Sequence, residues 1–316
     1  VYYFRKWANK GIMKIIKINP DGPEREKIKE VIEVLKKGGV IIFPTDTVYG
    51  MGADARDKQA INRIYQIKNR PKDKPLILFI EKKEKILNLV QKIPFLAQKL
   101  INDFWPGPLT LIFKAAISVP SNVISKEGKV GIRLPAHKIP CAIIKESQIL
   151  LATTSANISG EISPLNVEEI SENLKKRMDL IIDGGETLLG EESTVVDVTF
   201  SSPLLIREGW LSKEKIRESL KREGNILFVC TGNTCRSPMA EGFLKKMWPE
   251  GKDKVKISSA GTFTLVGLRP TELAIEALKE KGIDISSYHS TPLSKSLVEK
   301  ADLILVMSNF HKKVVS

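Results

Sequence analysis

The chain has 316 residues, about twice the ~150 residues of a typical domain, so two domains are expected. Hydrophobic residues make up 42% and charged residues 28% of the sequence, which argues against wholesale disorder and against a fibrous repeat. No apolar run approaches the ~20 residues that cross a bilayer, so we expect a soluble protein with no membrane partner. Three cysteines, Cys141, Cys230 and Cys235, are too few for a disulfide framework and indicate a cytoplasmic location.

The net charge of +13 is spread unevenly along the chain. Residues 1–20 carry five basic and no acidic side chains, and residues 221–316 carry 15 basic and 10 acidic ones. Residues 21–220 are nearly balanced, with 30 basic and 27 acidic side chains, which argues against one continuous nucleic-acid patch. Residues 1–12 lack a signal-peptide cleavage site and Met13 opens a strand-like run, so we expect Met13 to be the natural start.

Helical and strand-like patterns alternate through the first two thirds of the chain. Apolar residues lie at helical spacing over 24–37, and Gly38 and Gly39 end that helix. Asp57 is the expected N-cap of a second helix, over 57–69. Further helices are predicted over 94–102, 139–146, 166–178 and 213–222, and strands over 40–43, 76–80, 109–113, 130–134, 149–153, 179–182, 194–199 and 204–207. The alternation predicts a mixed α/β fold.

A break at Gly224 and Asn225 precedes a new apolar strand, so we predict two domains, 13–223 and 224–316. Beyond the break the patterns predict strands over 226–229, 255–258 and 302–307 and helices over 236–248 and 271–281. Strands that alternate with helices in this way build a parallel sheet.

The strongest local signal is the sequence CTGNTCRS at 230–237, between a strand and a helix. The five residues between Cys230 and Arg236 can wrap a loop whose backbone N–H groups point inward and bind a phosphate-like anion. The same field favours the thiolate of Cys230, which could attack phosphorus while Arg236 clamps two oxygens. Gly232 and Asn233 tolerate the left-handed backbone of such a loop. The alternative is that Cys230 is a small buried hydrophobe.

This motif, with SSAGT at 258–262 and ADLILVMS at 301–308, resembles the low-molecular-weight protein tyrosine phosphatase family. The resemblance implies a flavodoxin-like parallel sheet and a phosphoprotein substrate. It also implies that Cys230 is the nucleophile, Arg236 the transition-state clamp and Ser237 a hydroxyl that assists the thiolate. The implied phosphate loop consists of Thr231, Gly232, Asn233, Thr234 and Cys235.

Two positions of this loop refine the expectation. Cys235 matches the family's neighbouring thiol, which can protect the nucleophile as a disulfide. Thr234 matches the protein-arginine phosphatase branch, whereas tyrosine-specific members usually have an aliphatic residue there. We therefore favour phosphoarginine over phosphotyrosine as substrate.

One family feature has no match. The general acid of the family is an Asp in a D-P-aromatic loop, which does not occur here. Asp284 and Asp302 are the carboxylates nearest the end, but neither precedes a proline and we assign neither. Loss of general acid catalysis costs about 10²–10⁴ in rate. We expect an incomplete phosphatase domain in a truncated sequence, with a weak phosphatase or an anion-binding remnant as alternatives.

Polar loops stand out in the first domain, which contains no G-x4-G-K-[ST] loop of a Walker ATPase. They are PTDTVYGMGAD at 44–54, KNRPKDKPL at 68–76 and TTSAN at 153–157. The second loop gathers Lys68, Arg70, Lys72 and Lys74 at a helix end. Such cations could bind a polyphosphate, or they could simply complement the helix dipole.

Two arginines, Arg133 and Arg207, each interrupt a strand that is otherwise apolar. An unpaired buried charge is very costly. We therefore expect both side chains to be paired or to face a cavity.

Together with FWPGPLTL at 104–111, VGIRLP at 130–135, GEESTVVD at 190–197 and IREG at 206–209, these loops resemble, in order, the YrdC-like threonylcarbamoyl-AMP synthases. The resemblance covers nearly all of residues 21–220. It implies a twisted, mixed open sheet with a central cavity. The family combines L-threonine, bicarbonate and ATP into threonylcarbamoyl-AMP and pyrophosphate, for the modification of tRNA to threonylcarbamoyladenosine.

The resemblance also implies roles for individual residues. Lys68 and Arg70 are the implied catalytic pair, and together with Ser155 and Asn157 they grip the ATP phosphates. Threonine is held by Thr47, Arg133 and Thr194. Further nucleotide contacts are Lys74, Thr153, Ser163 and Arg207. Mg²⁺ accompanies ATP, and no dedicated protein metal site is expected.

We therefore predict a threonylcarbamoyl-AMP synthase fused to a phosphatase-like domain, with tRNA and the threonylcarbamoyl transferase complex as candidate partners. The alternative is an RNA-binding module of YrdC type, with the cysteine phosphatase as the only enzyme. Pyrophosphate release that depends on both threonine and bicarbonate would distinguish them.

Overall fold

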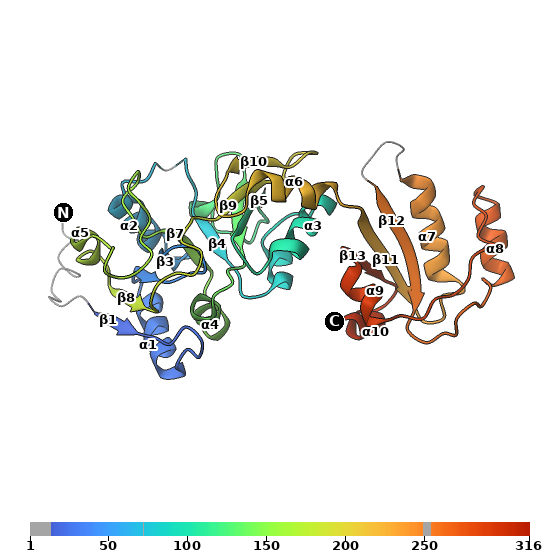
Figure 1. Ribbon diagram of the computed structural model, residues 1–316, viewed down its shortest axis with the longest axis horizontal. Helices are drawn as coiled ribbons and strands as arrows, with labels where there is room; N and C mark the ends of the chain where they lie inside the picture. The colour runs from blue at the N-terminus through green and yellow to red at the C-terminus, as the bar shows by residue number, and fades with distance from the viewer. Residues whose placement is uncertain (1–13, 72, 249–253) are drawn as a thin grey trace. The chain divides into compact units, whose positions relative to one another are not determined.

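The computed structural model describes residues 14–71, 73–248 and 254–316, so Lys72, Met13 and the segment 1–12 lie outside the described residues. The chain divides into two compact units, one ending at Ile216 and the other beginning at Arg217 (Figure 1). This division falls within helix α6 (Lys213–Lys221). Each unit is described by itself.

The first unit is built on a ten-stranded mixed sheet with the order β1-β8-β2-β3-β7-β4-β6-β5-β9-β10. Its strands are β1 (Ile15–Lys17), β2 (Ile41–Phe43), β3 (Gly50–Asp54), β4 (Ile77–Phe79), β5 (Leu109–Lys114), β6 (Lys129–Arg133), β7 (Leu151–Ser155), β8 (Leu180–Asp183), β9 (Thr194–Asp197) and β10 (Leu204–Arg207). Parallel pairs such as β4 with β6 are interleaved with antiparallel pairs such as β3 with β7. The predicted mixed α/β sheet is confirmed.

Helices cover both sides of this sheet. They are α1 (Arg25–Lys36), α2 (Lys58–Lys68), α3 (Phe95–Phe104), α4 (Lys138–Ser147) and α5 (Glu172–Lys175), with short 3-10 helices at Lys83–Asn88 and Ser121–Val123. The apolar stripe of α1 packs with Ile139 and Ile143 of α4 on the strands β2 and β8. Each such buried side chain contributes about 1.5–3 kcal/mol. In Figure 1, α1 and α4 lie below the sheet and α2 lies above it.

The helix predicted over 166–178 is wrong, because only the four residues of α5 are helical there. The Asn166 side chain accepts a hydrogen bond from Glu169 N (3.0 Å), and the Glu169 carboxylate accepts one from Leu165 N (2.8 Å). These local bonds compete with the helical hydrogen bonds of the same backbone. Val167 and Ile170 are still buried, as their apolar spacing suggests, but they do not lie in a helix.

Strand β3 was not predicted from the sequence. It pairs with β2 on one side and β7 on the other. A Cβ atom on Gly52 would lie 2.9 Å from the Ala152 carbonyl oxygen, so glycine permits this close approach. A glycine-rich strand lacks the alternating pattern on which strand prediction depends.

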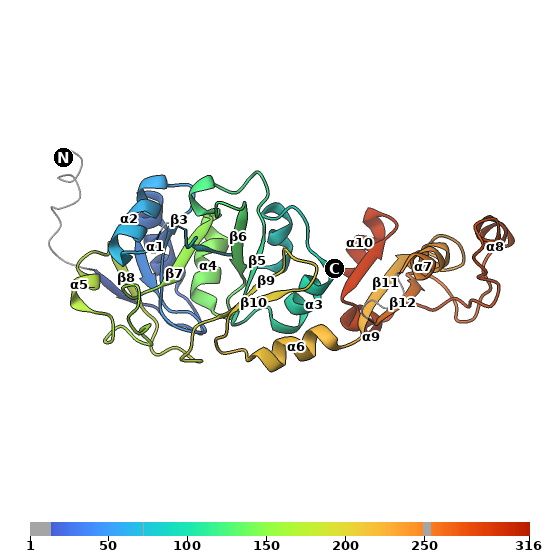
Figure 2. The ribbon, with the colours of Figure 1, turned by 90° about the horizontal axis from the view of Figure 1, so that it is seen from above.

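The second unit contains a three-stranded parallel sheet with the order β12-β11-β13, which confirms the predicted parallel sheet. The strands are β11 (Gly224–Cys230), β12 (Val255–Gly261) and β13 (Leu303–Val306), and the helices are α7 (Arg236–Met247), α8 (Glu272–Lys279), α9 (Lys295–Lys300) and α10 (Asn309–Val315). Leu297 of α9 and Val315 of α10 pack with Leu227 and Val229 of β11. Figures 1 and 2 show α7 on the opposite side of this sheet from α9 and α10.

Asp57 is the N-cap of α2, as predicted. Its Oδ1 atom accepts hydrogen bonds from Gln59 N (2.8 Å) and Ala60 N (3.0 Å). We expect Asp57→Ala to lower the free energy of unfolding by about 1 kcal/mol, because the two N–H groups lose their acceptor. Asp57→Asn keeps an acceptor in the same place and should cost less than about half of that. Urea unfolding followed by circular dichroism measures both, and equal losses would show that the cap is not responsible.

Candidate active sites

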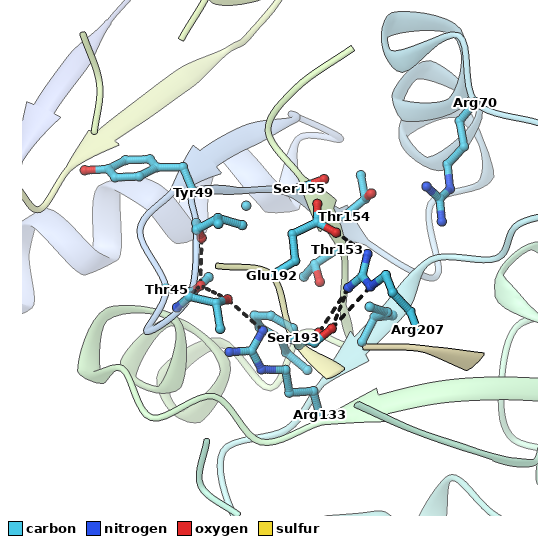
Figure 3. Close-up of a pocket in the computed structure, with 15 residues that line it drawn as sticks. Thr45, Tyr49, Arg70, Arg133, Thr153, Thr154, Ser155, Glu192, Ser193 and Arg207 are labelled. Carbon is cyan, nitrogen blue, oxygen red and sulfur yellow. Dashed lines mark hydrogen bonds and ion pairs between the residues drawn. The ribbon is translucent and has the colours of Figure 1, made fainter. Parts of the chain in front are cut away.

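A cavity opens in the first unit (Figure 3). Its lining consists of Thr45, Thr47, Val48, Tyr49, Gly50, Arg70, Ile77, Phe79, Arg133, Thr153, Thr154, Ser155, Glu192, Ser193 and Arg207. The lining combines hydroxyl groups and cations with a few apolar side chains, which is typical of a site for a polar small molecule. The predicted central cavity is confirmed.

Arg133 lies at the end of β6 and is buried beside this cavity. Its guanidinium donates to Asp46 Oδ1 (2.6 Å), to Thr47 Oγ1 (2.9 Å) and to the Gly107 carbonyl oxygen (3.0 Å). It also lies 5.6 Å from the centre of the Phe79 ring. The expectation that Arg133 is paired or faces a cavity is therefore confirmed in both respects.

The loop after β2 presents hydroxyl groups to the cavity. Thr45 Oγ1 lies 2.9 Å from Thr47 Oγ1 and donates to the Val48 carbonyl oxygen (2.7 Å). Tyr49 OH donates to the Gly185 carbonyl oxygen (2.7 Å), and burial raises the pKa of Tyr49 to about 12. These bonds fix the loop so that Thr47 points toward Arg133.

Lys68 is buried at the end of α2, behind the cavity wall. Its Nζ atom donates to Ser155 O (2.7 Å), Ser155 Oγ (3.2 Å) and Asn157 O (2.8 Å), and also to Asn157 Oδ1. All four acceptors are uncharged. Burial, followed by the nearby positive charge of Arg70, lowers the pKa of Lys68 to about 7.

The structure thus brings Lys68, Ser155 and Asn157 together, while Arg70 approaches the cavity separately. Arg70 Nε donates to Lys74 O (2.8 Å) and its Nη2 to Pro75 O (3.2 Å). Arg70 and Ser155 line the cavity, whereas Lys68 and Asn157 support it from behind. The family resemblance grouped these four residues, but it did not indicate which of them face the cavity.

Glu192 and Arg207 lie next to each other on the cavity wall (Figure 3). They form an ion pair, and Arg207 Nη2 also donates to Ser193 O (2.7 Å). Ser163 Oγ donates to Glu192 Oε1 (2.7 Å). Burial raises the pKa of Glu192, but Arg207, Ser163 and Ser155 outweigh it and hold that pKa below its usual range. The expectation that Arg207 is paired or faces a cavity is also confirmed.

Besides Lys68 and Asn157, three more of the predicted site residues do not line the cavity: Lys74, Ser163 and Thr194. Thr194 is completely buried, donates to the Leu211 carbonyl oxygen (2.6 Å) and accepts from the N–H groups of Gly209 and Leu211 (3.1 Å each). It therefore holds the turn that follows Arg207. Lining residues that the sequence did not identify are Thr45, Val48, Tyr49, Gly50, Ile77, Phe79, Thr154, Glu192 and Ser193.

In the second unit, Cys230 ends β11 at the floor of the predicted phosphate loop and is buried. Its Sγ atom lies 2.9 Å from Ser237 Oγ and accepts a hydrogen bond from Asn233 N (3.3 Å). The expected pairing of Cys230 with the Ser237 hydroxyl is thus present. Cys230 and Cys235 are both free thiols, and Cys235 is exposed.

Asn233 organises this loop from within. Its φ of 50° is left-handed, and its amide nitrogen donates to Ser237 Oγ and Ser259 Oγ (2.9 Å each). Its side-chain oxygen accepts from Thr291 N (2.7 Å) and Tyr288 OH (3.2 Å). With every polar atom of this buried amide bonded, the loop is held in one conformation before any ligand binds.

The rim of the loop is open to an anion. Among the described residues none accepts a hydrogen bond from the backbone N–H of Gly232, Thr234 or Cys235. Arg236 begins α7, is exposed, and its Nη2 lies 3.5 Å from Thr231 Oγ1. Unpaired N–H groups beside a helix N-terminus and an arginine suit a phosphate-like group.

His311 is a residue of this site that the sequence did not indicate. It is buried, with Nε2 3.0 Å from Thr231 Oγ1 and Nδ1 2.8 Å from Ser308 Oγ. Burial, followed by the positive charge of Arg236, lowers the pKa of His311. The imidazole lies between two hydroxyl groups and fixes the position of the Thr231 side chain at the rim.

The two carboxylates considered from the sequence lie in structural contacts. Asp302 is buried, forms an ion pair with Arg222 and accepts from Asn225 N (2.9 Å). Asp284 is exposed and accepts from Ser286 N (2.8 Å). Within the described ranges, no group of three or more His, Cys, Asp and Glu could hold a metal ion, and no helix is long and apolar enough to cross a bilayer.

Comparison with known proteins places both units. Residues 33–209 match the Sua5/YciO/YrdC family model, described as "Telomere recombination", and residues 225–316 match the model of the low molecular weight phosphotyrosine protein phosphatases. The chain is 42% identical over 195 residues to the threonylcarbamoyl-AMP synthase of Pyrococcus abyssi, which covers 62% of this chain and 57% of that protein. It therefore spans little more than half the length of that relative.

A further relative and a solved structure agree with this assignment. A putative threonylcarbamoyl-AMP synthase of Methanocaldococcus jannaschii is 37% identical over 213 residues, which cover 65% of this chain and 96% of that protein. The crystal structure of P. abyssi Sua5 complexed with L-threonine aligns with a TM-score of 0.62 at 30% identity, covering 92% of this chain and 91% of that one. On its sequence and its fold, the chain belongs to the Sua5/YciO/YrdC family, and it carries a low-molecular-weight phosphatase domain C-terminal to the family's domain.

Proposed function

We propose that the first unit is a threonylcarbamoyl-AMP synthase that uses L-threonine, bicarbonate and ATP. The observation that carries the proposal is one cavity with the buried Arg133 beside Thr47 at one end and two further arginines, Arg70 and Arg207, at the other. Both ends suit anionic groups, a carboxylate and a polyphosphate respectively. The identity with the P. abyssi synthase supports the same activity.

Threonine would lie beside Thr47 and Arg133. The structure of P. abyssi Sua5 complexed with L-threonine supports this amino acid as the ligand, because that protein shares the fold of this chain. Thr194 would act from behind, by holding the turn that positions Arg207. The triphosphate would lie against Arg70, Arg207, Ser155 and Thr153, with Lys68 and Asn157 behind them. Ser163 would position Glu192, to which its hydroxyl group donates a hydrogen bond. Lys74 would orient Arg70 through its backbone carbonyl group.

The chemistry requires two bond-forming steps. The neutral amine of threonine attacks the carbon of bicarbonate and gives a carbamate and water. A carbamate oxygen then attacks the α-phosphorus of ATP, and the bond to the leaving pyrophosphate breaks. Positioning and positive charge supply most of the acceleration in such a transfer. A transferase complex that acts on tRNA in the cytoplasm would consume the product.

Arg70→Ala should lower the rate of pyrophosphate release by about 10²-fold, because one cation that faces the triphosphate is lost. The assay measures pyrophosphate with threonine, bicarbonate and ATP, and omits each in turn. Arg56→Ala removes an exposed arginine that does not line the cavity and should leave the rate unchanged. Pyrophosphate release independent of threonine would contradict the synthase, and tRNA binding without release would support an RNA-binding module instead.

The lowered pKa of Lys68 predicts how nucleotide binding depends on pH. With a pKa of about 7 in the free protein, Lys68 is largely neutral at pH 9, and a bound triphosphate favours its charged form. Nucleotide binding should therefore take up a proton above pH 7, and affinity should fall as pH rises from 7 to 9. Lys68→Met should remove this part of the pH dependence in calorimetric titrations.

The exposed Lys58 lies on the same helix, so Lys58→Met is the matched control and should retain the full pH dependence. An identical pH profile in wild type and Lys68→Met would show that Lys68 does not titrate with binding.

We further propose that the second unit hydrolyses a phosphorylated side chain at the loop from Cys230 to Ser237. The thiolate of Cys230 attacks phosphorus, and the bond to the leaving group breaks while Arg236 and the open N–H groups hold the oxygens. Water then cleaves the thiophosphate and regenerates the thiolate. The partly exposed hydroxyl side chain of Thr234 favours phosphoarginine over phosphotyrosine.

Cys230→Ser should reduce phosphate release from a phosphoarginine peptide by at least about 10³-fold, because the nucleophile is lost. Cys141→Ser removes a cysteine of the other unit and should leave the rate unchanged. The same assay with a phosphotyrosine peptide tests the substrate preference. Binding of phosphate without any Cys230-dependent release would indicate an anion-binding remnant.

A further inference from the structure

Glu192 is the one carboxylate among the described residues that line the cavity. It lies in the ion pair with Arg207, accepts the Ser163 hydroxyl hydrogen at 2.7 Å, and has 31% of its side chain exposed. Lys68 and Ser155 also favour its charged form. A negative charge is thus held at the end of the cavity where the proposed function places a triphosphate.

This position is unfavourable for a bare triphosphate. Like charges close together in a partly buried site repel each other strongly, since solvent screens them little. The ion pair with Arg207 would have to open before Arg207 could bind a phosphate group. A divalent cation between Glu192 and the phosphates removes the repulsion, because each negative group then has a positive partner.

The donors present suit Mg²⁺. Magnesium prefers oxygen ligands and is usually held by one or two carboxylates together with substrate phosphates, rather than by a cage of protein groups. Glu192 supplies one carboxylate, and the hydroxyl groups of Thr153 and Ser155 line the same cavity. The described residues contain no cluster of three or more acidic, histidine or cysteine ligands, so the metal would have to arrive with the nucleotide.

We propose that Glu192 makes this site selective for the magnesium complex of a nucleoside triphosphate over the free triphosphate. When the complex enters, the Glu192–Arg207 pair exchanges partners: the carboxylate takes the metal and the guanidinium takes phosphate oxygens. No covalent bond changes in this step. The inference rests on the proposed synthase function, since it requires a triphosphate in the cavity.

Calorimetric titration of the full chain with an ATP analogue that cannot be cleaved at the α-phosphorus tests the proposal, once with excess magnesium chloride and once with EDTA. Wild type should bind the magnesium complex at least about tenfold more tightly than the free triphosphate. Glu192→Gln should bring the two affinities within about twofold to threefold of each other, chiefly through tighter binding of the free triphosphate. Glu192→Asp retains a carboxylate and should keep part of the preference.

The neighbouring Glu191 is exposed and does not line the cavity, so Glu191→Gln is the matched control and should behave as wild type. A magnesium preference that persists unchanged in Glu192→Gln overturns the inference and leaves the synthase proposal standing. The inference is also overturned if Glu192→Gln binds the magnesium complex and the free triphosphate more tightly by the same factor. The carboxylate would then only compete with the ligand for Arg207. A wild-type protein that binds neither form overturns the synthase proposal itself, and this inference with it.

Discussion

The guanidinium of Arg133 connects the parts of the first unit that enclose the cavity. From the end of β6 it reaches Asp46 and Thr47 in the loop after β2 and the backbone of Gly107. Removing one partner of a buried ion pair leaves the other charge uncompensated and costs about 3–5 kcal/mol. The second oxygen of Asp46 has no hydrogen-bond partner among the described residues, so this carboxylate depends on Arg133. The shape of the cavity therefore depends on one contact between distant segments.

Such contacts explain which parts of the fold could be predicted from the sequence. The helices α1 and α2 have both periodic apolar residues and clear termini, so local information and tertiary packing agree. In the segment around Asn166 they disagree, because side chains satisfy the backbone locally while the apolar residues are still buried. For β3 the local signal is missing, since hydrogen bonds from two neighbouring strands define it.

The site shows a similar division. The family resemblance grouped Lys68, Ser155 and Asn157, and the structure brings these three residues into contact where a helix and a strand end. The resemblance could not tell that Lys68 faces inward, or that the Thr194 hydroxyl is used entirely by a turn. Glu192 was missed because an acidic residue in a polar loop has no local pattern. Its role becomes visible only in the structure, where it lines the cavity and pairs with Arg207.

The two units accommodate an anionic ligand by different physical means. In the second unit the phosphate loop is fixed by the buried Asn233 amide. Its open N–H groups have no partner among the residues that the structure describes, so they lose no contact when an anion binds. In the first unit the cations at the cavity already have partners: Arg133 has Asp46 and Arg207 has Glu192. A ligand there must exchange contacts rather than simply add them, and the exchange favours only a ligand that satisfies the released carboxylate as well as the cation. This pairing also explains how residues 21–220 can focus positive charge in one cavity while remaining nearly balanced overall.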